Sequence, residues 1–482
     1  MNYPMIFNNI GKILLVEASL LVIPAIVAII YGEHTLLSFS LTIAILTAVG
    51  LLCLRKKTKK KSIYAKEGYV IVALSWILMS LFGALPFFLS GHIPSFVDAF
   101  FETVSGFTTT GSTILKEIET LPKSLLFWRS FTHWIGGMGI LVFVIAVMPK
   151  TESTSMHVMR AEVPGPTVGK LVSKLRASAR ILYGIYFVLT IVQAVFLLAG
   201  GMPLFDSIVT SFATAGTGGF AVLNNSIEGY NSLYSEMVIA VFMLIFGVNF
   251  NLYYMFLIRQ GKQAIKSEEL RWYIGIVAGS VIVIALSLIN TKHGVADSFR
   301  YSFFQVASII TTTGFSTTNF DTWPMIAKFI LVFLMIIGAC AGSTGGGIKV
   351  SRLIILVKSG LRDIKKAINP RSIETVKVDK RTVEEPVVKS VSVFFATYIL
   401  IAAASMFFVA IDGRDFATTS TAVIACIGNI GPGLGAVGPY GNFADFSVLS
   451  KLVLSFDMLA GRLELIPMLM LFSPYAWARK YQ

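Results

Sequence analysis

The stretch FTTTGST, from Phe107 to Thr113, decides how this chain folds, and TTTGFST repeats its pattern from Thr311 to Thr317. Both stretches place three consecutive threonines before one glycine, although 55% of the residues in the chain are hydrophobic. In such an apolar chain, irregular polar backbone is expected only where it lines a cavity or is packed within protein. The two stretches therefore indicate a structural unit that occurs more than once.

The composition predicts an all-α polytopic membrane protein. The 482 residues have a mean hydropathy of +0.75, and only 14% of them are charged. A helix that crosses the hydrocarbon core needs about 20 mainly apolar residues. About ten runs of this kind predict about ten transmembrane helices: roughly 12–31, 35–54, 69–90, 124–148, 181–201, 236–258, 272–290, 325–357, 391–411 and 447–473.

The net charge of +14 is explained by topology. Most of the 40 basic residues lie in the connections that follow even-numbered runs, within residues 55–66, 150–180, 259–271 and 349–389. Basic connections stay on the cytoplasmic side of a membrane. We therefore expect a multi-pass protein of the cell (plasma or inner) membrane with both termini in the cytoplasm. The basic residues do not alternate with aromatic ones, so no nucleic-acid partner is expected.

Threonine- and glycine-rich segments follow runs three, five, seven and nine, on the opposite side of the membrane. The first and third read FFETVSGFTTTG and FFQVASIITTTG, and the second and fourth read SIVTSFATAGTG and STAVIACIGNIG; they end at Gly111, Gly314, Gly218 and Gly431. Each segment is too short for two spans, which favours a re-entrant half-helix that returns through extended backbone. Threonine and glycine that only pack helices in lipid are the alternative. That alternative does not explain four occurrences on one face.

Such a pattern suits a pore for a dehydrated cation. A conducting pore must replace the oxygens of the ion's hydration shell, and rings of backbone carbonyls do so in potassium filters. Glycine permits the required backbone dihedrals, and threonine can add a hydroxyl ligand or brace the segment from behind. Four helix, pore loop, helix repeats in one chain are therefore expected to close a ring in a pseudo-fourfold arrangement.

Four further motifs occur in order along the chain: HWIGGMGI at His133–Ile140, GSTGGGIKVSR at Gly342–Arg352, GNIGPG at Gly428–Gly433 and FDMLAGRLELIP at Phe456–Pro467. With the repeats, they resemble the Trk/Ktr/HKT superfamily of potassium transporters, and the TrkH branch in particular, over essentially the whole chain. The resemblance implies potassium uptake, with a filter at Thr110, Gly111, Thr217, Gly218, Thr313, Gly314, Ile430 and Gly431. Sodium-favouring members of the superfamily tend to carry serine at the first filter glycine. Gly111 therefore favours K⁺, with Rb⁺ accepted and Na⁺ weaker.

The repeats divide the chain into five parts. Residues 1–66 are expected to form two N-terminal helices and a basic cytoplasmic loop. The four repeats are expected at 67–165, 166–265, 266–370 and 371–482, with a broken second helix in the third.

The glycine-rich run GACAGSTGGG, from Gly338 to Gly347, starts some 13 residues into the eighth apolar run and so near mid-membrane. We interpret it as a loop that lines the cavity below the filter and acts as a gate, with Gly338, Gly342, Gly345, Gly346, Gly347 and Lys349 as its candidate residues. A packing notch for a neighbouring helix is the alternative. A nucleotide-binding P-loop is excluded because Ile348, Lys349 and Val350 follow where GK[ST] is needed.

Arg462 lies about 15 residues into the last run, at a similar depth. A charge at this depth is costly unless it faces protein or water. The resemblance favours a position in the pore, where the positive charge would restrain cation flux. A structural ion pair with Asp457 or Glu464 is the alternative.

Two other functional classes fit the sequence less well. A sodium- or proton-coupled secondary transporter would also be repetitive, but here all four repeats have one orientation and no embedded acidic pair is apparent. A membrane enzyme would need clustered nucleophiles, bases or metal ligands, which the motifs lack. We expect no covalently bound cofactor, with K⁺ as the transported ion. The resemblance implies a cytosolic nucleotide-binding, TrkA-like regulatory ring, which residues 358–389 could dock, and a homodimer.

Overall fold

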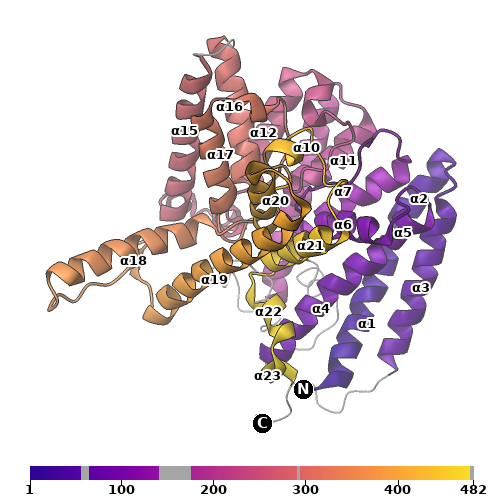
Figure 1. The fold of residues 1–482 in the computed structure, drawn as a ribbon, viewed down its shortest axis with the longest axis horizontal. Coiled ribbons are helices and arrows are strands. Elements are labelled where there is room, and N and C mark those ends of the chain that lie inside the picture. The colour runs from indigo at the N-terminus through magenta and orange to yellow at the C-terminus, as the bar shows by residue number, and fades with distance from the viewer. Residues whose placement is uncertain (56–64, 140–174, 290–293, 478–482) are drawn as a thin grey trace.

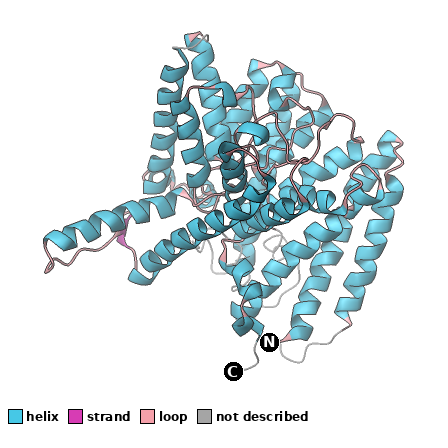
Figure 2. Ribbon diagram, viewed as in Figure 1, coloured by secondary structure: helices cyan, strands magenta, loops and turns pink. Residues whose placement is uncertain are grey.

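The computed structural model describes residues 1–55, 65–139, 175–289 and 294–477. Within these residues the protein is built from helices (Figures 1 and 2), and the strands are β1 (Lys377–Val378) and β2 (Arg381–Thr382), which pair antiparallel. Most of the predicted basic loop at 55–66 and much of the basic connection at 150–180 lie outside the described residues.

The N-terminal part is a helical hairpin beside the first repeat. It consists of α1 (Tyr3–Leu20), α2 (Val22–Tyr31) and α3 (Leu36–Leu54), and α1 and α2 together form one apolar span. Helices α1 and α3 pack closely at two glycines, because a Cβ atom on Gly11 would lie 2.7 Å from the carbonyl oxygen of Gly50. Small residues allow helix backbones to approach this closely in membranes.

We group the helices that follow into four sets, called repeats one to four after the predicted units, and each set has an outer helix, a short helix and a second helix. The first contains α4 (Ala65–Gly83), α5 (Leu85–Leu89), α6 (Phe96–Phe107) and α7 (Lys123–Gly137). The second contains α10 (Leu175–Ala199), α11 (Leu204–Gly216), α12 (Leu233–Phe246), α13 (Phe250–Leu257) and α14 (Gly261–Ile265). The third contains α15 (Glu268–Ile289), α16 (Val295–Ile310), α17 (Met325–Ile337) and α18 (Val350–Ile368). The fourth contains α19 (Glu385–Val409), α20 (Phe416–Gly428), α21 (Val448–Arg462), α22 (Ile466–Phe472) and α23 (Pro474–Trp477).

The second helices are shorter than the apolar runs that predicted them. Six described spans are long and apolar enough to cross a membrane, or seven if the bent pair α12 and α13 counts as one. The helices α7, α12, α17 and α21 have only 15, 14, 13 and 15 residues. The chain bends by 89° between α12 and α13, and it breaks after α17 and α21. The sequence predicted such a break only in the third repeat.

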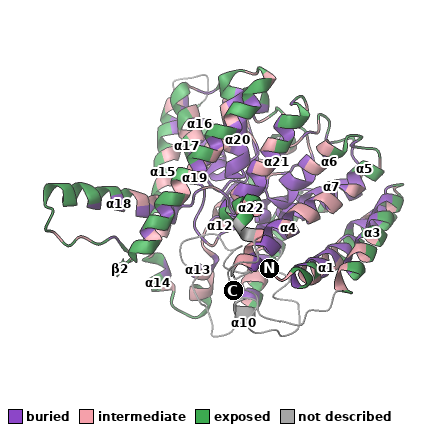
Figure 3. Ribbon diagram, turned by 60° about the horizontal axis from the view of Figure 1, so that its bottom comes forward, coloured by how far each residue is buried: buried purple, intermediate pink, exposed green. Residues whose placement is uncertain are grey.

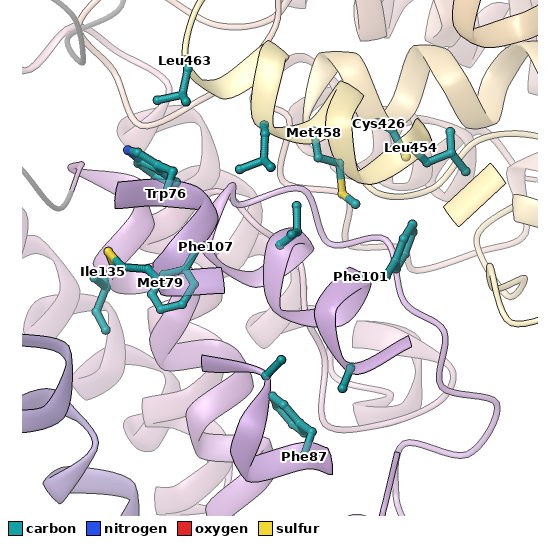
Figure 4. Close-up of a cluster of buried hydrophobic side chains, with 14 of the residues drawn as sticks. Trp76, Met79, Phe87, Phe101, Phe107, Ile135, Cys426, Leu454, Met458 and Leu463 are labelled. Atoms are coloured by element: carbon teal, nitrogen blue, oxygen red, sulfur yellow. The ribbon is translucent and has the colours of Figure 1, made fainter. Parts of the chain in front are cut away.

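A hydrophobic cluster joins the first repeat to the fourth (Figure 4). Helices α4 to α7 meet α20, α21 and the residue after α21 there, with the labelled side chains Trp76, Met79, Phe87, Phe101, Phe107, Ile135, Cys426, Leu454, Met458 and Leu463. Repeats at opposite ends of the chain are thus neighbours. This contact lets the four repeats enclose a common centre.

The outer faces are apolar and exposed, whereas the buried residues gather around the centre (Figure 3). Leu400 and Phe407 on α19 are 70% and 73% exposed. Contiguous exposed apolar surface of this kind is rare on soluble monomers and suits contact with lipid. Helix α18 extends away from the body beside the β1 and β2 strands (Figures 1 and 3).

Candidate ion filter and gate

The short helices α6, α11, α16 and α20 all end in the same turn. Each is followed by a residue in the left-handed region, with φ between 55° and 57°: Thr109, Thr217, Thr312 and Asn429. The next N–H then bonds a carbonyl five residues earlier, over 2.8 to 3.0 Å: Thr110 to Ser105, Gly218 to Ala213, Thr313 to Ser308 and Ile430 to Ala425. This is the hydrogen bond that closes a Schellman turn.

One glycine follows two positions after each left-handed residue. These glycines are Gly111, Gly219, Gly314 and Gly431, with φ of 84°, 75°, 87° and 96°. Residues with a Cβ atom rarely adopt this backbone conformation. We call residues 109–111, 217–219, 312–314 and 429–431 the ring segments 1 to 4.

The predicted register of ring segment 2 is wrong by one residue. The sequence alignment paired Gly218 with Gly111, Gly314 and Gly431, but the backbone pairs Gly219 with them. Gly218 instead occupies the position of Thr110, Thr313 and Ile430, and Thr217 that of Thr109. Because Gly218 and Gly219 are adjacent, alignment on glycine alone does not distinguish them, whereas alignment of Thr217 with Thr109 and Thr312 gives the observed register.

The four ring segments follow one another around a closed ring. A Cβ atom on Gly111 would lie 2.0 Å from the carbonyl oxygen of Gly218, and one on Gly219 would lie 2.0 Å from that of Thr313. A Cβ atom on Gly314 would lie 2.1 Å from the carbonyl oxygen of Ile430, and one on Gly431 would lie 2.9 Å from that of Thr110. Segment 1 thus contacts 2, segment 2 contacts 3, segment 3 contacts 4, and segment 4 contacts 1.

The ring opens into an outer cavity of about 100 Å³, which is lined by all four ring glycines, Gly111, Gly219, Gly314 and Gly431. Hydrogen bonds connect neighbouring repeats near the ring: the Ser112 hydroxyl donates to the Gly431 carbonyl over 3.1 Å, and the Ile227 N–H donates to the Ser316 carbonyl over 3.1 Å. At the rim, a hydrogen bond from Lys116 lowers the pKa of the Asp445 carboxyl.

The threonine hydroxyls brace the ring segments from behind. The hydroxyls of Thr108 and Thr110 lie 2.8 Å apart, and those of Thr311 and Thr313 lie 2.8 Å apart as well. In segment 4 the Asn429 amide donates to the Thr110 hydroxyl over 3.0 Å and so connects segments 4 and 1. The sequence left open whether the hydroxyls are ligands or braces. For these four threonines the contacts are those of braces.

The glycine-rich loop, residues 338–349, lies directly against the inner side of the ring. The N–H of Gly346 donates to the Thr312 hydroxyl over 2.6 Å, and a Cβ atom on Gly346 would lie 2.4 Å from the Gly428 carbonyl oxygen. Gly338, Gly342 and Gly347 have φ of 74°, 70° and 74°. The buried Lys349 side chain donates to the carbonyl of Gly345, inside the loop.

The loop also contacts the bend between α12 and α13. The Cys340 N–H donates to the Gly247 carbonyl over 3.1 Å, and the Phe250 N–H donates to the Gly342 carbonyl over 3.0 Å. The bend exposes backbone groups that a continuous helix would pair internally. The loop is thus hydrogen-bonded to the second repeat as well as to the third.

Arg462, the last residue of α21, connects the loop to the first repeat. Its guanidinium donates to the Thr344 carbonyl over 2.8 Å, to the Gly137 carbonyl over 2.7 Å and to the Gly136 carbonyl. Of the two acids weighed as its partners, Asp457 accepts from the Ser405 hydroxyl over 2.7 Å and Glu464 pairs with Arg352. The guanidinium therefore bridges α7 and the glycine-rich loop.

Sequence reasoning missed Glu269, which connects the glycine-rich loop to the start of α18. Its carboxylate accepts the N–H of Ala341 over 2.7 Å and that of Ser351 over 3.2 Å. In the sequence, Glu269 is one of two acids at the start of an apolar run, where acids commonly sit in the first turn of a helix. No local pattern indicated that its partners lie about 70 to 80 residues further along the chain.

Comparison with known proteins gives concordant matches over the whole chain. A family model described as TrkH, cation transport protein, matches residues 37–479. The Trk system potassium uptake protein TrkH of Salmonella typhimurium is 36% identical over 486 residues, covering 99% of this chain and 100% of the relative. The Trk system potassium uptake protein TrkG of Escherichia coli is 34% identical and covers 94% of both chains. The crystal structure of the potassium transporter TrkH from Vibrio parahaemolyticus matches with a TM-score of 0.89 and 34% identity, covering 99% of this chain and 100% of that one.

Proposed function

The chain belongs to the TrkH family of cation transport proteins, and from this premise we propose that it takes up potassium across the cell membrane through the four ring segments. The observation that carries the proposal is the closed ring, in which each segment's glycine lies against the carbonyl of the next segment. Carbonyl rings of this kind replace the hydration shell of K⁺.

The proposed filter residues are Thr110, Gly111, Gly218, Gly219, Thr313, Gly314, Ile430 and Gly431, after the correction of the second register. Helices α6, α11, α16 and α20 all direct their carboxyl ends at the ring. The carboxyl end of a helix carries a partial negative charge of about half an elementary charge. Four such ends favour a cation at the ring without any acidic side chain in the filter.

The preference for potassium is supported by the space around Gly111. A side chain there would collide with the carbonyl of Gly218, so even serine would push segments 1 and 2 apart. A change in the distances between carbonyls alters which dehydrated ion is coordinated best. We therefore propose that K⁺ and Rb⁺ permeate better than Na⁺.

The glycine-rich loop is proposed as the gate, with Gly338, Gly342, Gly345, Gly346, Gly347 and Lys349 in the loop and Arg462 as its tether. The loop contacts the ring and shields it from the cytoplasmic side, so conduction requires it to move. Its glycines carry no side chains that would oppose the movement.

Regulation is proposed to come from a cytosolic nucleotide-binding, TrkA-like ring that docks on residues 358–389. Helix α18 begins where the glycine-rich loop ends, and its far part extends from the body with exposed Lys365 and Lys366. A partner that pulls on α18 would act directly on the loop. We further propose a homodimer in the inner membrane with both termini in the cytoplasm, as the basic connections favour.

Ion flux into liposomes that hold the purified protein tests the proposed function. Uptake of ⁸⁶Rb⁺ should exceed uptake of Na⁺ and Li⁺, should follow the cation's own gradient, and should vanish in a folded Gly314→Asp variant. Uptake that a proton or sodium gradient drives against the Rb⁺ gradient would instead establish a coupled secondary transporter. Equal flux of all four alkali cations, K⁺ included, would reject the filter.

A further inference from the structure

A buried ion pair lies behind ring segments 1 and 2. It joins Glu102 on α6 to Arg129 on α7, with 2.6 Å between Nε and Oε1, and the two side chains are 0% and 2% exposed. Burial of two charges is costly, and a buried pair is not by itself a gain in stability. Its presence therefore calls for an explanation beyond stability.

Both partners of the pair contact the backbone just outside the ring. The Glu102 carboxylate accepts the Thr113 hydroxyl and the Ile114 N–H, each over 2.9 Å. These residues follow Gly111 by two and three positions. The pair is thus bonded to the chain where it leaves ring segment 1.

The arginine holds the equivalent part of ring segment 2. The Arg129 guanidinium donates to the Ala221 carbonyl over 3.2 Å, and its central carbon lies 3.7 Å from the centre of the Phe220 ring. Phe220 and Ala221 directly follow Gly219. One ion pair therefore connects the residues that directly follow ring segment 1 to those that directly follow ring segment 2.

The equivalent positions of the other three repeats are uncharged. Nine residues before the ring glycine, Glu102 is replaced by Thr210, Gln305 and Ala422. Seven residues after the N-cap of the second helix, Arg129 is replaced by Ile239, Leu331 and Leu454. The repeat fold forms three times without the pair, so the pair is not a requirement of the fold.

We infer that Glu102 and Arg129 are positioning residues that fix the distance between ring segments 1 and 2 and thereby the ion preference of the filter. The inference rests on the proposed potassium filter. The bonded carboxylate and guanidinium resist separation of the two segments, which the uncharged side chains at the equivalent positions of the other repeats do not. A small change in this spacing alters the coordination of K⁺ and Na⁺ by different amounts.

The test replaces the pair by the side chains that the third repeat carries, in the variant Glu102→Gln/Arg129→Leu. Either single substitution would leave an unpaired buried charge and could prevent folding. The matched control is Glu236→Gln/Arg300→Leu, which removes a pair that joins α12 to α16 over 2.7 Å. Both double variants, in liposomes, are compared with the parent for ⁸⁶Rb⁺ flux, Na⁺ flux and melting temperature.

The expected result is a folded double variant whose Rb⁺-over-Na⁺ flux ratio is about tenfold below that of the parent. This change corresponds to the loss of about one charge-assisted hydrogen bond. The control variant should keep the parental ratio. A folded double variant with the parental ratio would overturn the inference. If the double variant does not fold, Thr113→Val removes one hydrogen bond to Glu102 instead. A lowered Rb⁺-over-Na⁺ ratio in this variant would support the inference, and a parental ratio would overturn it. A parent without any Rb⁺ preference would reject the proposed function itself.

Discussion

Replacement of Arg462 by alanine should increase the cation flux. The guanidinium makes one hydrogen bond to the glycine-rich loop, at the Thr344 carbonyl, and two to the end of α7. A hydrogen bond to a charged group contributes about 1.5–3 kcal/mol. If the loop bond alone is lost, the population of the displaced loop, and with it the flux, should increase about 10- to 100-fold.

The positive charge itself can also restrain the flux. A unit charge about 5–8 Å from a permeating ion opposes it by about 2–3 kcal/mol at an effective dielectric constant near 20. The two causes are similar in size, and Arg462→Lys separates them. Lysine keeps the charge but cannot bridge the carbonyls of Thr344 and Gly137 with a planar fork. Flux in the lysine variant near that of alanine would assign the restraint to the tether, and flux near that of the parent would assign it to the charge.

The assay is ⁸⁶Rb⁺ uptake into liposomes, measured together with Na⁺ uptake and melting temperature. The Rb⁺-over-Na⁺ ratio should stay at the parental value, because the bonds of Arg462 to Thr344 and Gly137 hold the loop and α7. An Arg462→Ala variant with parental flux and a lowered melting temperature would refute the reasoning. The guanidinium would then serve only to join α21 to its neighbours.

Three further changes test the ring and the loop by the same assay. Gly111→Ser should lower the Rb⁺-over-Na⁺ ratio because its side chain meets the Gly218 carbonyl, and a parental ratio would contradict the assigned ring. Gly346→Ala should change basal flux strongly without a change in the Rb⁺-over-Na⁺ ratio, since its Cβ atom would lie 2.4 Å from the Gly428 carbonyl oxygen. Parental flux in this variant would show that the loop serves only to pack the helices. Glu269→Gln weakens the bonds that connect the glycine-rich loop to the start of α18 and should raise basal flux about 10-fold, by loss of one charge-assisted bond, whereas an unchanged flux would show that the loop is held elsewhere.

The sequence predicted the ring because its signal is local and repeated. FTTTGST and TTTGFST occupy equivalent places, and the paired hydroxyls of Thr108 with Thr110 and Thr311 with Thr313 repeat the same contact. Apolar runs and the distribution of basic residues predicted a helical membrane protein. These patterns depend on residues close in the sequence, which is why they could be interpreted without coordinates.

The register of ring segment 2 depends on backbone conformation, and alignment on glycine alone did not give it. It requires Thr217 to adopt φ of 55°, a region that β-branched residues rarely enter. Propensity would assign the left-handed position to glycine. Contacts that over-determine the turn, such as the bond from the Gly218 N–H to the Ala213 carbonyl, override that preference.

The break between α12 and α13 has a tertiary cause as well. Its sequence, Gly247, Val248 and Asn249, contains one glycine and no proline, and an isolated glycine is tolerated within a helix. The backbone freed by the bend bonds the glycine-rich loop about 90 residues later, through the Gly247 carbonyl and the Phe250 N–H. A pattern confined to one run cannot contain that information.

A single chain with four unequal repeats can carry features that a symmetric tetramer would have to carry four times. Arg462 stands at the end of α21 in the fourth repeat. The third repeat has no arginine at the end of α17 and supplies the glycine-rich loop there instead. Four copies of this arginine around one pathway would raise the opposing energy to about 8–12 kcal/mol by the same Coulomb arithmetic, which would abolish conduction. One copy leaves a restraint that movement of a single loop can relieve. Under the proposed function, the unequal repeats would therefore permit a selective ring together with a weak, releasable block.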